Sequence, residues 1–105
     1  ATRVRVPLFF GQAMAVSLEI EEPLSSEAAS ALIAAAPGIV LAEQIEGGGY
    51  PTPADVIGED AVWVGRVRAD ERHNSVELWI AGDNLRKGAA VNAVQIAEIL
   101  LRDYL

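Results

Sequence analysis

Residues 62–80 of the chain read VWVGRVRADERHNSVELWI, and this stretch predicts a β-hairpin. Its two halves, Val62–Val67 and Val76–Ile80, are rich in the β-branched and aromatic residues that favour strands. The polar residues 70–74 between them suit a turn. Two strands joined by so short a connection pair antiparallel, which predicts the type of sheet.

Two further strands are predicted upstream of this hairpin. Residues 14–21 read MAVSLEIE, in which apolar and mostly polar or small side chains alternate, as expected of a half-buried strand. An earlier period-2 segment, Val4–Phe10, also predicts a strand. Because Pro7 cannot donate to a sheet ladder, we expect this first strand to lie at an edge or to carry a bulge, and to end at Gly11.

Two helices complete the predicted fold. Apolar residues recur at helical spacing over 25–36 before Pro37-Gly38, and a broad apolar arc runs over 85–105. A strand at 39–45 and a glycine- and proline-rich loop at 47–53 follow the first helix. The order ββαβββα predicts a single α+β domain over residues 1–105, with a predominantly antiparallel, mixed sheet and helices on one face.

Composition restricts the classes of function. The 105 residues are one domain's worth, too few for a two-domain oxidoreductase. The net charge of −7 argues against binding to nucleic acid or to an anionic membrane surface. The chain has no cysteine, no apolar run of roughly 18 residues and no signal-peptide core at Ala1–Arg5. These features predict a soluble cytoplasmic protein whose chain alone is not a complete enzyme.

Few residues suggest chemistry by themselves. Arg5 places a cation on the first predicted strand, and Gln12 places an amide seven residues later. The segment 82–90 combines an Asp/Asn helix cap with Arg86 and Lys87, a hypothetical anion site, although two cations beside a cap occur on many surface helices. His73, the single histidine, lies in the predicted turn without a partner at metal-ligand spacing, so no metal site is predicted.

Several of these segments, in this order, resemble the final third of bacterial aspartate-semialdehyde dehydrogenases. The resemblance covers nearly the whole chain. It implies a C-terminal domain of the glyceraldehyde-3-phosphate-dehydrogenase-like type, part of a homodimer, whose terminal helix 85–105 docks on an amino-terminal Rossmann domain. The segments are Arg5-Val6-Pro7, Tyr50-Pro51-Thr52-Pro53, Val64-Gly65-Arg66-Val67-Arg68 and Asp83-Asn84-Leu85-Arg86-Lys87-Gly88-Ala89-Ala90 with Asn92–Glu98.

The resemblance also implies roles for three residues. Arg5 matches the arginine that holds the substrate carboxylate, and Asn84 matches a position near the cofactor NADP, which the Rossmann domain binds in the main. Gln12 occupies the position of the family's acid/base histidine. A carboxamide cannot exchange protons near neutral pH as an imidazole does, and losing a general acid/base costs roughly 10²- to 10⁴-fold in rate.

Three functions remain open from the sequence. The whole protein is a weakened or inactive relative of the enzyme, similar to its divergent paralogues, or it is an active dehydrogenase with another proton acceptor or another semialdehyde. The parent enzyme interconverts aspartyl phosphate and aspartate semialdehyde, a step of amino-acid biosynthesis. The third possibility is a self-associating module without catalysis.

Overall fold

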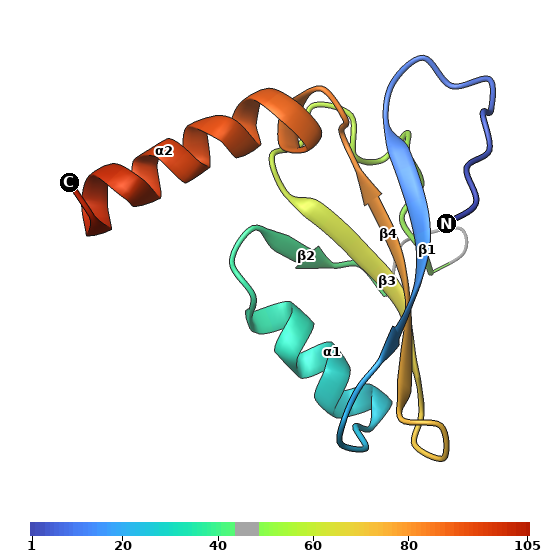
Figure 1. Cartoon of the computed structure of the whole chain (residues 1–105). Coiled ribbons are helices and arrows are strands. Elements are labelled where there is room, and N and C mark those ends of the chain that lie inside the picture. Colours follow the sequence, from blue (N-terminus) through green and yellow to red (C-terminus); the bar gives the residue numbers. More distant parts are fainter. Residues whose placement is uncertain (44–48) are drawn as a thin grey trace.

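The computed structural model describes residues 1–43 and 49–105 and forms one four-stranded sheet with two helices (Figure 1). The strands lie in the order β1-β4-β3-β2. β4 is antiparallel to both β1 and β3, whereas β2 runs parallel to β3. The α+β class and the mixed, predominantly antiparallel sheet are therefore confirmed. The elements are β1 (Gln12–Glu19), α1 (Ser26–Ala35), β2 (Ile39–Leu41), β3 (Val62–Asp70), β4 (Ser75–Gly82), a π-helical turn η1 (Arg86–Ala90) and α2 (Val91–Asp103).

The predicted hairpin is the centre of the sheet. β3 and β4 pair from Asp70↔Ser75 at the turn to Trp63↔Ala81 at the far end, and a bulge between Gly65 and Arg68 shifts the register. β1 then pairs along the whole outer edge of β4, as expected for an alternating half-buried strand. The hairpin prediction and the strand predicted at 14–21 are confirmed, with β1 beginning and ending two residues earlier than predicted.

Helix α1 covers the β2–β3 part of one face of the sheet. Its N-cap Ser25 accepts a hydrogen bond from the backbone N–H of Ala28, and Ala29 is buried against the sheet. The helix ends before Gly38, which has a φ of +74°. Glycine adopts this left-handed conformation without strain, as is common just after a helix. Its buried side faces the main core, which consists of Ala29, Val64, Val67 and Val76 with partly buried neighbours around them.

The strand predicted at Val4–Phe10 is wrong. All residues of this segment are exposed, Phe9 by 96%, and the segment loops out beyond one end of β1 (Figure 1). An alternating pattern forms a strand only where a partner strand supplies hydrogen bonds, and among the described residues the pairs of β1 involve β4 alone. Pro7 has no backbone N–H, so this segment also lacks one hydrogen-bond donor that a sheet would need. The strand predicted at 39–45 is observed at Ile39–Leu41, and its last two residues lie outside the described ones.

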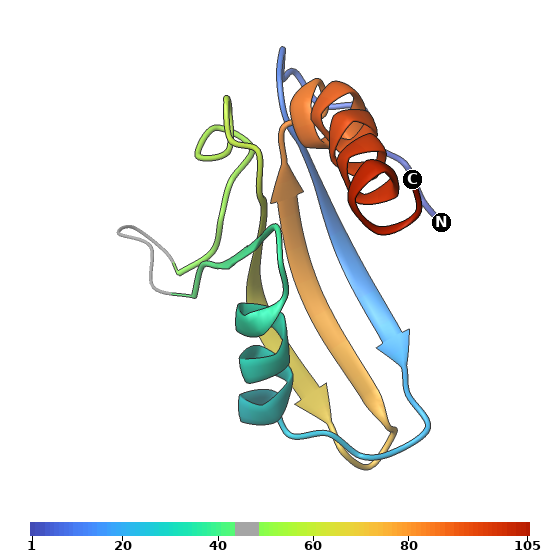
Figure 2. The same ribbon diagram turned by 90° about the vertical axis from the view of Figure 1, so that its left-hand side faces the viewer.

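The second helix differs from α1 in its surroundings. Both helices lie on the same side of the sheet, but α2 leads away from its end instead of lying flat on it (Figures 1 and 2). Most of its apolar residues are exposed, among them Val94, Ile96 and Leu101. Docking of this helix on a Rossmann domain remains a prediction. Within the described part of the chain, no helix is both long and apolar enough to cross a membrane.

Candidate functional site

Two of the predicted site residues meet where β1 begins and β4 ends. The ladder pairs Gln12 with Gly82, so the segments that flank these residues are also neighbours. One residue before Gln12, the backbone N–H of Gly11 donates a hydrogen bond to the side-chain Oδ1 of Asn84 over 2.9 Å. The structure therefore brings Gln12 and Asn84 together although 72 residues separate them in the sequence. We call this end of the sheet the site end.

Gly88 in the turn η1 lies against both side chains. A Cβ atom added at Gly88 would be 3.7 Å from Nε2 of Gln12 and 3.7 Å from Cβ of Asn84. The backbone N–H of Gly88 donates to the carbonyl oxygen of Asp83 over 3.1 Å, five residues back, as in a π-turn. Single π-turns often mark functional sites, and this one places the start of the terminal helix beside Gln12.

Asp83 holds the site end together. Its side chain is buried, with Oδ2 accepting a hydrogen bond from the N–H of Gly58 and Oδ1 accepting from the N–H groups of Leu85 and Arg86, at distances of 2.9, 2.9 and 3.2 Å. These bonds, that of Gly58 first, hold the pKa of the Asp83 carboxyl below its usual range. Sequence reasoning identified a helix cap here but missed the long-range bond to Gly58.

The proline-rich loop packs under the site end. Pro51 is fully buried and its carbonyl oxygen accepts a 2.7 Å hydrogen bond from Nε1 of Trp79 on β4. Pro53 approaches Gly11 so closely that a Cβ at Gly11, whose φ is +83°, would lie 2.9 Å from the Pro53 carbonyl oxygen. Without the resemblance this loop is only a predicted surface turn. In the structure the loop packs against Gly11 and Trp79 and so borders the site end.

The same loop also contacts the bulge in β3. A Cβ at Gly65 would lie 2.7 Å from Cδ of Pro51, so no larger residue fits there without movement. Arg66 follows in the left-handed region, with φ of 53°, and its guanidinium lies 5.8 Å from the centroid of the Tyr50 ring. Arg66 and Arg68 are both exposed.

Arg5 is not joined to the other predicted site residues. It lies in the exposed segment before β1, and no hydrogen bond or ion pair connects it to another residue of the described ranges. Its side chain is therefore available to a ligand. The role of Arg5 in holding a carboxylate remains a prediction.

The polar groups of the hypothetical anion site at 82–90 make several internal contacts, and anion binding there remains a prediction. Asp83 takes the N–H groups of the first turn, Nε of Arg86 pairs with Asp60 over 2.6 Å, and Nζ of Lys87 donates to Gln95. The ion pair raises the pKa of Arg86 above its usual value, so this cation stays charged and paired. Asp83 thus takes the backbone N–H groups of Leu85 and Arg86, whereas each of the two cationic side chains uses only part of its donors in these contacts.

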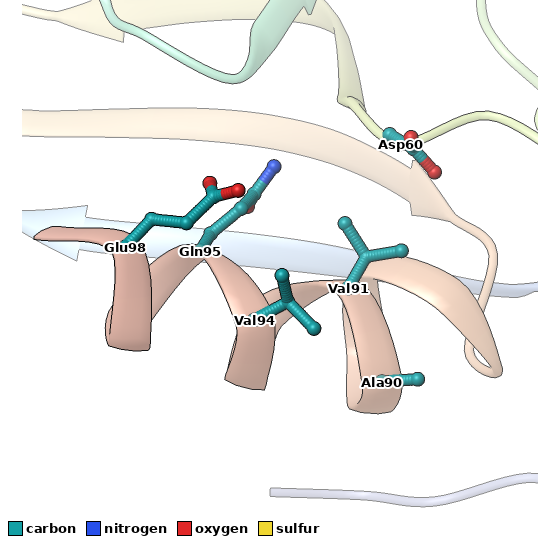
Figure 3. Close-up of a pocket in the computed structure, with 6 residues that line it drawn as sticks. All are labelled: Asp60, Ala90, Val91, Val94, Gln95 and Glu98. Atoms are coloured by element: carbon teal, nitrogen blue, oxygen red, sulfur yellow. The ribbon is translucent and has the colours of Figure 1, made fainter.

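A shallow groove lies beside these contacts, between α2 and the loop before β3 (Figure 3). Its volume is about 330 Å³, and its lining includes two carboxylates and no cation. Asp60 is paired with Arg86, so Glu98 leaves the lining acidic, which disfavours the phosphates of a dinucleotide. Over residues 1–43 and 49–105, no three His, Cys, Asp or Glu residues gather as metal ligands, and His73 is an exposed turn residue bonded to Asp70. The lining residues are Asp60, Ala90, Val91, Val94, Gln95 and Glu98.

Comparison with known proteins identifies the family of this arrangement. A family model described as "Semialdehyde dehydrogenase, dimerisation domain" matches residues 1–87, which include the whole sheet and the site end. The chain belongs to the semialdehyde dehydrogenase dimerisation-domain family. The predicted resemblance is thereby confirmed.

Named relatives of this dimerisation domain agree with the match. An aspartate-semialdehyde dehydrogenase of Legionella pneumophila is 49% identical over 106 residues, covering 99% of this chain and 30% of the relative. A crystal structure of aspartate semialdehyde dehydrogenase II from Vibrio cholerae complexed with ASA superposes with a TM-score of 0.83 at 47% identity, covering 96% of this chain and 30% of that one. A probable aspartate-semialdehyde dehydrogenase from Pseudomonas aeruginosa superposes with a TM-score of 0.78 at 42% identity. The dimerisation domain thus spans about 30% of the length of these relatives.

Proposed function

We propose that this domain works within a longer, homodimeric, NADP-dependent protein of the aspartate-semialdehyde dehydrogenase type, as its C-terminal domain. The parent reaction interconverts aspartyl phosphate and aspartate semialdehyde. Support comes from the curated relatives, which bear this enzyme's name at 42–50% identity. We further propose that the reaction is weakened or lost here, and the observation that carries this is Gln12 at the site end.

The chemistry of residue 12 supports weakened proton transfer. The structure places Gln12 exposed at the start of β1 with its amide beside η1, where a side chain can reach a ligand. In the parent reaction a cysteine outside this chain would attack the aldehyde. An imidazole at position 12 would take the proton of that thiol near neutral pH and pass it to the oxyanion that becomes the thiohemiacetal hydroxyl. The amide of Gln12 can orient such groups by hydrogen bonds but has no pKa in that range. The site would then retain binding while losing proton exchange.

Arg5 is the proposed substrate contact. An arginine binds a carboxylate through two parallel N–H···O bonds, which favours an acidic semialdehyde over a neutral aldehyde. Arg5 has no carboxylate partner among the described residues and lies seven positions before Gln12, on the segment that leads into the site end. Exposure of this segment is consistent with a surface that other parts of the protein complete.

NADP would be held mainly outside this domain. Among the residues described here, the groove beside α2 has an acidic lining, and Arg86 and Lys87 are engaged in internal contacts. Asn84 can contribute one contact, because its Oδ1 is used by Gly11 while its Nδ2 donor remains for a cofactor oxygen. Bound NADP would supply hydride transfer in the parent reaction, and this domain's residues would only position and neutralise the substrate.

The test is Gln12→His in the complete protein, assayed by phosphate-dependent reduction of NADP with aspartate semialdehyde. We expect the unaltered protein to be slow and the variant to be faster by roughly 10²- to 10⁴-fold, with a new limb in the pH–rate profile near pH 6.5. Glu71→His, at an exposed residue of the turn between β3 and β4, is the control and should leave the rate unchanged. Robust turnover by the unaltered protein would contradict the weakened version.

Two alternatives are separated by the same experiment. An active dehydrogenase with another proton acceptor, or one acting on another semialdehyde, predicts robust turnover by the unaltered protein and a further rise in rate with Gln12→His. A self-associating module without catalysis is favoured by the exposed apolar residues of β1 and α2, among them Met14, Leu18 and Leu101. It predicts no turnover in either protein, together with dimers in sedimentation at micromolar concentration.

A further inference from the structure

We infer that Asn84 is a positioning residue for position 12, acting through its side-chain oxygen on the backbone of Gly11. This inference rests on the proposed function, because it concerns the same site. It assigns to the Asn84 carbonyl oxygen a role that is separate from any contact of its amide nitrogen with the cofactor.

The hydrogen bond between the two segments is well defined in direction. A backbone N–H can only donate, so the atom of Asn84 that faces Gly11 is the oxygen, 2.9 Å away and partly buried. The two residues are 73 positions apart, so the bond belongs to the tertiary structure and not to a local turn. It joins the residue before β1 directly to the segment that leads from β4 into η1 and the terminal helix.

Gly11 is the residue whose conformation most needs such a bond. Glycine adopts positive and negative φ about equally. The backbone before β1 therefore has more conformational freedom with glycine at position 11 than it would have with any other residue there. In the structure Gly11 has φ of +83° and is wedged against Pro53. The ladder to β4 fixes Gln12 from its carboxyl side, and the bond from Asn84 fixes it from its amino side.

Asn84 is itself held in place on both sides. The preceding residue, Asp83, is buried and accepts hydrogen bonds from three backbone N–H groups. Gly88 lies against Cβ of Asn84 and against the amide of Gln12, with no side chain of its own between them. The two side chains and Gly88 therefore form one packed unit, and the direction of side chain 12 depends on the position of Asn84.

The substitutions Asn84→Ala and Asn84→Asp separate the two roles. Alanine removes both the acceptor and the donor. Aspartate keeps an oxygen that can accept from Gly11 but removes the amide donor and adds a negative charge that repels the cofactor phosphates. A displaced catalytic group lowers turnover, because a misplacement of about 1 Å can cost on the order of 100-fold.

The kinetic test uses the complete protein with Gln12→His. Adding Asn84→Ala should lower kcat by about 10-fold or more, whereas adding Asn84→Asp should keep kcat within about threefold and raise the KM for NADP. Asn74→Gly, in the turn between β3 and β4 and away from the site end, is the control and should change neither parameter. Equal losses of kcat with Asn84→Ala and Asn84→Asp would overturn the positioning role.

A second measurement does not depend on catalysis. Amide hydrogen exchange at Gly11 should accelerate at least 10-fold in Asn84→Ala and stay near that of the unaltered protein in Asn84→Asp. Unchanged protection of Gly11 in Asn84→Ala would overturn the inference even if Gln12→His proves active. If Gln12→His stays inactive while the exchange result is as expected, the proposed function fails and the positioning inference stands.

Discussion

The two ends of the β3–β4 hairpin use the same chemistry for different purposes. At the hairpin end, which is the turn 70–74, Asp70 accepts hydrogen bonds from the N–H of Arg72 and from Nδ1 of His73, two and three residues away. At the site end, Asp83 also accepts from its near neighbours but reaches Gly58, 25 residues away. The Asp70 side chain is 44% exposed, whereas Asp83 is buried.

The difference separates a local turn from a tertiary junction. The hairpin end would close in the same way in any antiparallel pair with this turn, because its contacts lie within a few residues. The site end exists only when three distant segments, around Gly11, Gly58 and Asn84, are assembled. We therefore expect substitutions at the site end to cost more than comparable substitutions at the hairpin end.

The largest expected effect on stability is that of Gly11→Ala. Alanine at φ of +83° is strained, and its Cβ would lie 2.9 Å from the Pro53 carbonyl oxygen, so backbone must move. Together these effects should lower the free energy of unfolding by about 3 kcal/mol, measured by urea denaturation of the chain. Gly58→Ala is the matched control, because Gly58 has φ of +84° with nothing near its missing Cβ. It should cost about 1 kcal/mol.

Equal costs at these two glycines would show that the contact with Pro53 does not constrain the site end. The same result would weaken the argument that Gly11 is wedged in one conformation.

Removing the two carboxylates should give the next largest difference. Asp83→Ala leaves the N–H of Gly58 and two N–H groups of the helix start without their acceptor, and should lower Tm by on the order of 10 °C. Asp70→Ala should lower Tm by about 2 °C or less, because water replaces its exposed contacts. Thermal unfolding followed by circular dichroism measures both. A larger loss at Asp70 than at Asp83 would reverse the comparison.

The pH dependence of stability should show the same order. Hydrogen bonds, from the Gly58 N–H to Asp83 and from His73 to Asp70, lower the pKa of each carboxyl in the folded state. The unfolded state then binds more protons in acid, so this stability is present above the unfolded pKa of about 3.9 and is lost as pH falls through the folded value. Asp83→Asn should flatten the acid loss of stability more than Asp70→Asn does.

The smallest effect is expected from Asn74→Gly at the hairpin end. Asn74 closes the turn with φ of 48°, a conformation that glycine adopts freely. The free energy of unfolding should therefore change by less than about 0.5 kcal/mol, the ordinary range for surface substitutions. A loss of more than about 1 kcal/mol would show that the Asn74 side chain has a structural role beyond its backbone conformation.

The sequence predicted the helices and strands better than the long-range contacts that join them at the site end. The hairpin, the strand β1 and the helix α1 follow from alternation, helical spacing and caps, which are properties of neighbouring residues. Val4–Phe10 has the same alternation as β1 but remains without a partner, and a pattern alone does not show whether a partner exists. The broad apolar arc of the terminal helix stays largely exposed in the structure, and the sequence does not show what covers it.

By itself, the sequence determined the α+β class, the family resemblance and the presence of an amide at position 12, because these depend on residue types and their order. Only the tertiary structure decided that Asn84 bonds to Gly11, that Asp83 reaches Gly58 and that Pro53 presses on Gly11. Those contacts join residues 25 to 73 positions apart. No local propensity specifies them, because they form only when packing of the sheet brings the segments together.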